Sequence, residues 1–167
     1  MLLEEFYDYK NQLIGELIQN EKIIEMLRDT SEGAPYLQPE EFIYKHIFPF
    51  EFVPDTLDHG ISFICCDVDI QKGTKTFYKP IIYVWVITHK SLLRLPEGGV
   101  RIDELSSEVA KIMCGSRMYT MGELELQSVK RFAPIADYQG RALTFTGKEF
   151  SFVRPTGKVI PSNRKNG

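Results

Sequence analysis

The chain has 167 residues, enough for one domain with a substantial hydrophobic core. Its 43% hydrophobic and 26% charged residues are the proportions of an ordinary soluble globular protein. The formal net charge of −3 excludes an affinity for nucleic acid that is driven by overall charge. No apolar run approaches the ~20 residues of a membrane span, and the start lacks the pattern of a signal peptide, so we expect no membrane partner.

Charge is distributed unevenly along the chain. Residues 1–50 contain ten acids and four bases, which gives this segment a net charge of −6. We predict a single α+β domain over residues 1–153 and an extended basic C-terminal arm over residues 154–167. The acidic and basic regions either pair between neighbouring subunits or form a solvated helix and a frayed tail that contact nothing. The bases of the arm are Arg154, Lys158, Arg164 and Lys165.

The N-terminal third is predicted to contain two helices followed by a long loop. Apolar residues recur at helical spacing over residues 2–28, and Asn20 is placed to cap a second, shorter helix. Residues 29–60 contain four prolines and two glycines, which repeatedly interrupt regular structure. Because the segment 46–54 is unusually aromatic for a loop, we expect the core or another subunit to cover it.

The rest of the chain is predicted to contain four strands and one further helix. Residues 61–70 and 77–89 are rich in β-branched and aromatic residues, and a polar hairpin connection joins them. Apolar spacing predicts a helix over residues 101–114. Residues 122–150 have the pattern strand, turn, strand, with an irregular step near Ser128.

This order of elements predicts the α+β class. We expect a four-stranded, mainly antiparallel sheet with the helices packed on one of its faces. The long irregular loop lies after the N-terminal helices.

The polar residues do not form a recognisable catalytic motif. Asp67 and Asp69 lie two apart on a predicted strand and face the same side, an arrangement that can bind a divalent cation. The acid–x–lysine element that commonly completes a nuclease site is missing from the next strand. Cys65 and Cys66 are adjacent on a strand and point to opposite faces, so they suit neither a shared metal nor a mutual disulfide. We therefore expect no enzymatic activity, no metal and no cofactor.

The segment from Gly122 to Phe150, GELELQSVKRFAPIADYQGRALTFTGKEF, carries the most specific pattern in the chain. It resembles the C-terminal signature of tailed-phage tail terminators, small ring-forming proteins of the head–tail junction, or neck. The stretch IFPFEFVPDT, ahead of the first long strand, adds to the resemblance. The approach to the third strand departs from the family pattern, because Thr120-Met121-Gly122 replaces Gly-Ile-Gly. The matching residues are Leu124, Leu126, Ser128, Phe132, Pro134, Tyr138, Gly140, Arg141, Leu143 and Phe145.

The resemblance implies a structural protein of a siphophage-type virion. Such a protein forms a homohexameric ring that caps the tail tube and joins it to the head connector. The implied partners are further copies of the chain, the tail tube protein and a head–tail connector or head-completion protein, while genomic DNA passes through the lumen without specific binding. The ring would assemble in the host cytoplasm and end at the head–tail junction of the virion. The residues that the resemblance makes structural members of the turn are Phe132, Pro134, Tyr138, Gly140 and Arg141.

Two segments are candidate contacts with neighbouring subunits. Leu92, Leu93 and Leu95 lie in a loop with proline and glycine, where a tube or connector subunit would cover exposed leucines. The alternative is a loop that folds back on its own sheet. The second candidate is the arm, through Arg154, Lys158, Arg164 and Lys165.

Three alternative functions stay open at this point. A head-completion or adaptor protein of the same neck is the nearest. A small metal-dependent nuclease that uses Asp67 and Asp69 belongs to a different class, as does an unrelated soluble binding module.

Overall fold

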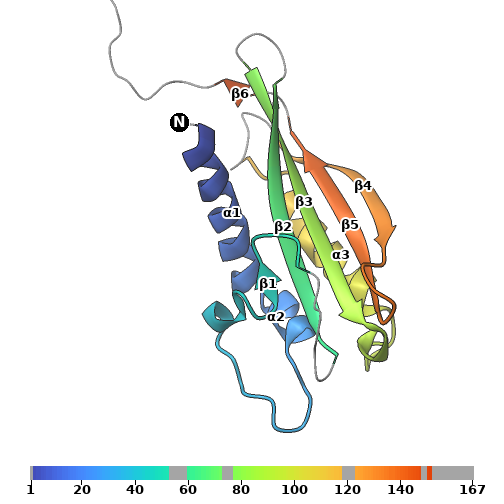
Figure 1. Ribbon diagram of the computed structural model, residues 1–167. Helices are drawn as coiled ribbons and strands as arrows, with labels where there is room; N and C mark the ends of the chain where they lie inside the picture. The colour runs from blue at the N-terminus through green and yellow to red at the C-terminus, as the bar shows by residue number, and fades with distance from the viewer. Residues whose placement is uncertain (1, 53–59, 73–76, 118–122, 148–149, 152–167) are drawn as a thin grey trace, which may run out of the picture.

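The computed structural model describes residues 2–52, 60–72, 77–117, 123–147 and 150–151. Figure 1 shows a sheet with α3 behind it and α1 beside β2. In chain order the elements are α1 (Leu2–Gln19), α2 (Glu21–Leu27), the 3-10 turn η1 (Pro39–Phe42), β1 (Ile47–Phe48), β2 (Ser62–Lys72), β3 (Phe77–His89), the 3-10 turn η2 (Lys90–Leu92), α3 (Arg101–Met113), β4 (Glu125–Phe132), β5 (Tyr138–Thr146) and β6 (Phe150–Ser151).

The break between α1 and α2 lies where the sequence predicts it. The side-chain oxygen of Asn20 accepts a hydrogen bond from the backbone N–H of Ile23 at 3.1 Å, which satisfies one of the free donors of the second helix. Asn20 itself adopts an extended conformation, so the chain changes direction there. The prediction of a capped second helix is confirmed.

The sheet has the strand order β1-β2-β3-β5-β4, and β6 pairs with β3 beside this path. The pairs β2–β3, β3–β5 and β4–β5 are antiparallel, and β1 runs parallel to β2. The α+β class and the mainly antiparallel sheet are confirmed, but the predicted count of four strands is too low. The missed strands, β1 and β6, have two residues each, which is too short to show any periodicity.

The β4–β5 pairing contains the irregularity expected near Ser128. Register shifts between Leu126 and Ser128, so the alternation of side chains changes there. The strand lies at the edge of the sheet, and most of its side chains are exposed. An unpaired outer edge is therefore present along β4 in the described structure.

All three α-helices pack on one face of the sheet, as predicted. The helices contribute the apolar stripes that the sequence shows, and the sheet contributes alternate residues of its central strands. This side contains Leu13, Leu17, Ile23, Leu27, Ile102, Leu105 and Val109 from the helices, with Ile64, Cys66, Ile82, Val84, Val86, Leu143 and Phe145 from the strands.

The opposite face carries a smaller, aromatic cluster. The Phe48 and Phe52 rings stack with centroids 4.2 Å apart, and Phe63 meets both edge-on. Cys65 belongs to this cluster while its neighbour Cys66 belongs to the helix side, which confirms that the two thiols point apart. The aromatic loop segment is thus covered in part by its own sheet. Among the described residues, no helix is both long and apolar enough to cross a membrane.

Candidate interaction surfaces

Five signature residues lie in the turn between β4 and β5 or in the adjoining ends of these strands: Phe132, Pro134, Tyr138, Gly140 and Arg141. Tyr138 is 5% exposed, and its ring meets Phe63 and His89 in edge-to-face contacts, with centroids 5.8 and 5.1 Å away. Burial raises the pKa of the Tyr138 phenol. Phe132 and Pro134 are half-buried beside it. The signature residues therefore lie together, and Tyr138 attaches the turn to β2 and β3.

Gly140 is required by the close approach of β5 to β3. A Cβ atom at this position would lie 2.4 Å from the backbone oxygen of Val86, and a backbone atom cannot move aside as a flexible side chain can. Glycine is therefore the residue that fits here.

A groove of ≈ 880 Å³ lies between the end of the β4–β5 hairpin and the first turn of α3. Arg131 and Arg141 occupy directly opposed positions on β4 and β5, and both line the groove. Arg141 Nε donates to the Asp103 carboxylate at 3.0 Å. The other residues that line the groove include Val100, Ile102, Phe132 and Ile135, so its walls are partly apolar.

A second feature lies at the opposite edge of the sheet, on either side of β1. Tyr44 precedes β1 with a φ of 64°, and it is 65% exposed. Phe50 follows β1, is 44% exposed, and its ring centroid lies 6.3 Å from that of Tyr44. Glu51 is exposed next to Phe50. We call Tyr44, Phe50 and Glu51 the β1-edge knob.

Tyr44 gives the knob an unusual left-handed backbone conformation. A bulky residue with positive φ is rare, because its Cβ crowds the backbone. Among the described residues, Tyr44 alone shows this conformation without being glycine. The turn that imposes it is closed by a hydrogen bond from Tyr44 N to Ile47 O at 2.9 Å. Strain at an exposed aromatic residue is a reason to suspect a contact function.

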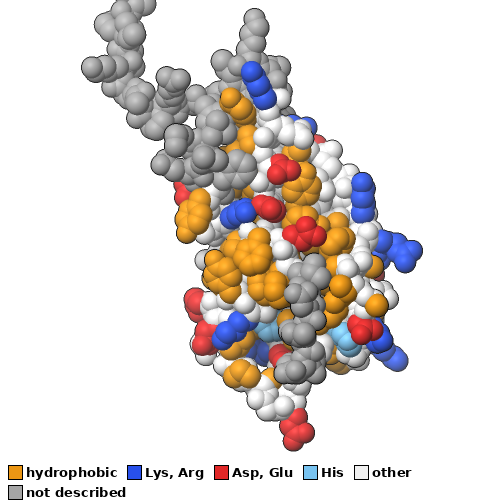
Figure 2. Space-filling model, viewed as in Figure 1, with side chains coloured by type: hydrophobic (Ala, Val, Ile, Leu, Met, Phe, Trp, Pro, Cys, Tyr) orange, Lys and Arg blue, Asp and Glu red, His pale blue; other side chains and the backbone are white. Residues whose placement is uncertain are grey.

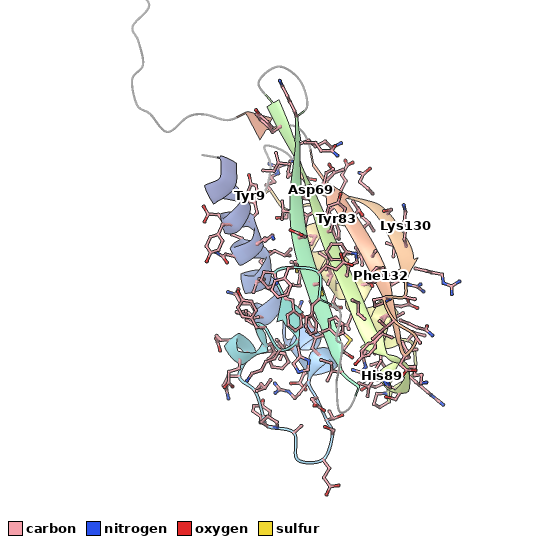
Figure 3. All side chains as sticks on the ribbon, in the orientation of Figure 1. Tyr9, Asp69, Tyr83, His89, Lys130 and Phe132 are labelled. Atoms are coloured by element: carbon pink, nitrogen blue, oxygen red, sulfur yellow. The ribbon has the colours of Figure 1, made fainter. Side chains whose placement is uncertain are left out.

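The face of the sheet without helices carries the two carboxylates that raised the nuclease alternative. Asp69 and Tyr83 lie on this face, and Phe132 lies on the same side of β4 (Figure 3). The Tyr83 and Trp85 rings stack at 5.8 Å. Burial and a hydrogen bond with Asp69 raise the pKa of the Tyr83 phenol. Figure 2 shows hydrophobic and acidic side chains mixed on this face, with Lys and Arg projecting from the edge that Figure 1 assigns to β4.

Asp67 and Asp69 face the same side, as predicted, but they have protein partners. Lys10 Nζ lies 2.7 Å from Asp67 Oδ1, and Asp69 bonds to the Tyr83 phenol. In the part of the chain that the structure describes, no three His, Cys, Asp or Glu residues are grouped so as to hold a metal ion.

Of the two alternatives for the leucines after β3, the structure favours a loop that folds back on its own domain. Leu95 is 8% exposed, and Leu93 packs against the main core. Arg101 holds the loop in place, because its guanidinium donates to the carbonyl oxygens of Leu92 at 2.8 Å and Met26 at 2.7 Å. The domain therefore buries Leu95 without a partner subunit, while Leu92 and Leu93 are half-buried.

The basic arm lies outside the described residues, with Arg154, Lys158, Arg164 and Lys165. Its role stays a prediction. The surfaces that sequence reasoning missed are the knob and the opposed arginine pair. Tyr44 carries no turn-forming signal of the Gly or Asn type, and the Arg131–Arg141 pairing depends on a register that the bulge shifts.

Comparison with known proteins identifies a family to which most of the chain matches. The YomW family model matches residues 20–147, which include every described strand except β6 and all of α2 and α3. No curated protein matches the chain. The family name has the form of a gene of the Bacillus phage SPBc2 and associates the chain with phages, without specifying a tail terminator. The chain belongs to the YomW family.

Proposed function

We propose that this protein is a structural component of a tailed-phage virion, a tail terminator that forms a ring between the tail tube and the head connector. Membership of a phage-associated family supports the setting. The signature in the β4–β5 hairpin supports the terminator role. The remaining support comes from surface chemistry.

The observation that carries the proposal is the placement of large exposed hydrophobic side chains. They fall into two groups, one around the N-terminal helix and the β1 edge and one around β4 and the start of α3. Two separate apolar surfaces at opposite edges of the sheet suit head-to-tail association of subunits. Such association closes into a ring when the rotation between subunits allows it. The first group is Tyr7, Tyr36, Tyr44 and Phe50, and the second is Val100, Leu126 and Val129.

In the proposed mechanism, one face of the ring covers the last ring of the tail tube and stops its growth. The other face presents a surface to the head connector. DNA passes through the lumen, and a chain with a net charge of −3 has no general attraction that would hold it there. The ring acts by occupying the end of the tube, so the mechanism includes no bond-making step.

Deleting the gene from a phage that encodes this protein tests the proposal. We expect filled heads that lack joined tails, together with tubes of abnormal length, and restoration of normal particles by the protein supplied in trans. Particles of normal morphology and yield from the deletion strain would contradict a terminator role.

A head-completion or adaptor protein of the same neck is the second candidate. The two contact surfaces suit either role, but the roles predict different deletion products. Loss of an adaptor leaves tails of normal length beside unjoined heads, whereas loss of a terminator alters tube length. Tail length in electron micrographs therefore separates them.

The nuclease alternative is disfavoured by the ion pair between Lys10 and Asp67. Replacing Asp67 and Asp69 together with asparagine is expected to leave particle assembly nearly unchanged. Metal-dependent cleavage of DNA by the wild-type protein, lost in the double variant, would reverse this assignment.

A further inference from the structure

We infer that the β1-edge knob of one copy docks into the β4–β5 groove of the next copy, with Glu51 meeting the opposed arginines. The inference rests on the proposed function, since it names the contact through which a ring would close. It concerns only residues that the structure describes: Tyr44, Phe50 and Glu51 on one edge, and Val100, Arg131, Ile135 and Arg141 on the other.

The groove has more positive than negative charge among its lining side chains. Arg131 and Arg141 oppose each other across β4 and β5, and like charges in directly opposed positions repel. Asp103 pairs with Arg141 at 3.0 Å, while Arg131 has no ion pair among the described residues. A further carboxylate entering the groove would relieve the repulsion and match the guanidinium geometry.

The knob supplies that carboxylate together with apolar surface. Glu51 is exposed beside Phe50, whose ring packs at 5.9 Å from the buried Phe48. Tyr44 completes the knob from the other side of β1. Two aromatic side chains that insert between apolar walls provide the buried centre that stable interfaces have. The groove, at ≈ 880 Å³, has room for them.

The positions of knob and groove determine the type of assembly. The knob flanks β1, at one end of the strand order, and the groove is built on β4 and β5 at the other end. Contact between two different surfaces at opposite edges is heterologous, so each copy offers a free knob and a free groove to the next. The outcome is a ring or a filament of repeated contacts, and a twofold dimer does not satisfy it.

A copy of this chain fits the groove better than a DNA phosphate does. The apolar lining at Val100, Ile102 and Ile135 would leave a phosphate poorly hydrated. Because DNA is the competing occupant of the groove, the test must also be able to detect binding to duplex DNA.

A charge exchange tests the contact on the full-length protein. Reversing the charge at position 131 with Arg131→Glu is expected to weaken self-association by about tenfold or more, because it places Glu51 against a like charge. Glu51→Arg is expected to weaken it similarly, and the double variant should recover much of the loss. Lys130→Glu is the matched control, since Lys130 is the neighbouring base on β4 and does not line the groove. Circular dichroism establishes that each variant is folded.

Self-association is measured by analytical ultracentrifugation and by photo-cross-linking. With a photoreactive phenylalanine analogue at position 50 and a mixture of isotopically light and heavy protein, we expect intermolecular products that join position 50 to residues 131–141. Cross-linking detects a transient contact even where sedimentation shows monomers. Products confined to other segments, or none between copies, would overturn the inference.

The remaining outcomes separate this contact from the proposed function. Recovery of association in the double variant without a closed ring supports the contact and counts against a terminator. A ring that persists in both single variants, Arg131→Glu and Glu51→Arg, overturns the contact and leaves the terminator role in place. Equal weakening by Lys130→Glu also overturns it, as does an Arg131-dependent affinity for duplex DNA without self-association.

Discussion

Two apolar loops of this molecule have opposite relations to solvent. The loop that contains Leu93 and Leu95 has the composition of a contact surface, yet Leu95 is 8% exposed and Leu93 packs on the core. The segment around β1 was expected to be covered, and Phe48 is indeed buried, while Tyr44 and Phe50 remain 65% and 44% exposed. Apolar composition alone therefore does not decide which loop is exposed to solvent.

The difference comes from what fixes each backbone. Arg101 binds two carbonyl oxygens beside the leucine loop and holds it against α2 and the core. At β1, pairing with β2 directs Phe48 inward. The turn before β1 gives Tyr44 a left-handed backbone, and the Tyr44 side chain is exposed. Long-range contacts that sequence spacing does not reveal therefore determine how exposed each loop is.

The largest expected effect is on stability in the leucine loop. Leu95→Ala should lower the free energy of unfolding by about 2–5 kcal/mol, because it removes buried methyl groups from a packed site. Phe50→Ala is the matched comparison in the knob and should cost no more than about 1 kcal/mol, since much of that ring is in water. Chemical denaturation measures both, and equal losses would contradict the contrast between the loops.

A second test addresses the floor of the groove. Gly140→Ala should destabilise the fold by about 1–3 kcal/mol, because the added methyl collides with the Val86 carbonyl. Gly15→Ala is the control, since a Cβ at Gly15 meets nothing within 4 Å and alanine favours the helix. If both alanines are tolerated equally in thermal unfolding, the close approach of β5 to β3 is wrong.

A third test separates stability from function at the knob. Tyr44→Gly should raise the free energy of unfolding by up to about 1 kcal/mol, because glycine adopts the positive φ without strain. The same change removes an aromatic contact and should weaken self-association. A variant that loses stability as well as association would indicate that Tyr44 supports the fold instead of a partner.

The smallest expected effect is a pH dependence beneath the knob. His46 is 5% exposed, and its Nδ1 lies 2.8 Å from the Ser62 carbonyl oxygen. Burial lowers the pKa of His46 below its usual 6.5, so the unfolded state binds the proton first as pH falls.

The sign follows from that shift. The stability that the neutral His46 ring contributes is complete above its pKa in the unfolded state and is lost as pH falls through its pKa in the folded state. The free energy of unfolding then falls by no more than about 1.4 kcal/mol per pH unit. Denaturation from about pH 7.5 to about pH 5.5 avoids the ordinary range of carboxylates. His46→Gln should flatten the curve. An unchanged slope in the variant would assign the pH dependence to other groups.

Most of the fold was predictable because it follows local periodicity. The sequence contains a recognisable local pattern for the helix break at Asn20, for the long strands β2 and β3 and for the irregular step near Ser128. The short strands β1 and β6 leave none. Their pairing depends on tertiary contacts, so they were missed.

The candidate site was less predictable for the same reason. Tyr138, Gly140 and Arg141 were identified by their pattern, but their grouping with Asp103 required the packing of α3 against the hairpin. Tyr44 gave no signal at all, because an exposed tyrosine with positive φ results from the turn that follows it. Surfaces assembled from distant segments cannot be read from spacing.

We propose that this chain is a virion protein that acts as a ring. Quantitative mass spectrometry of purified particles, combined with gold labelling of the protein in electron micrographs, tests it most directly. We expect six copies per particle and label confined to the junction of head and tail. Absence of the protein from intact particles, or label distributed along the tail or over the head, would contradict it.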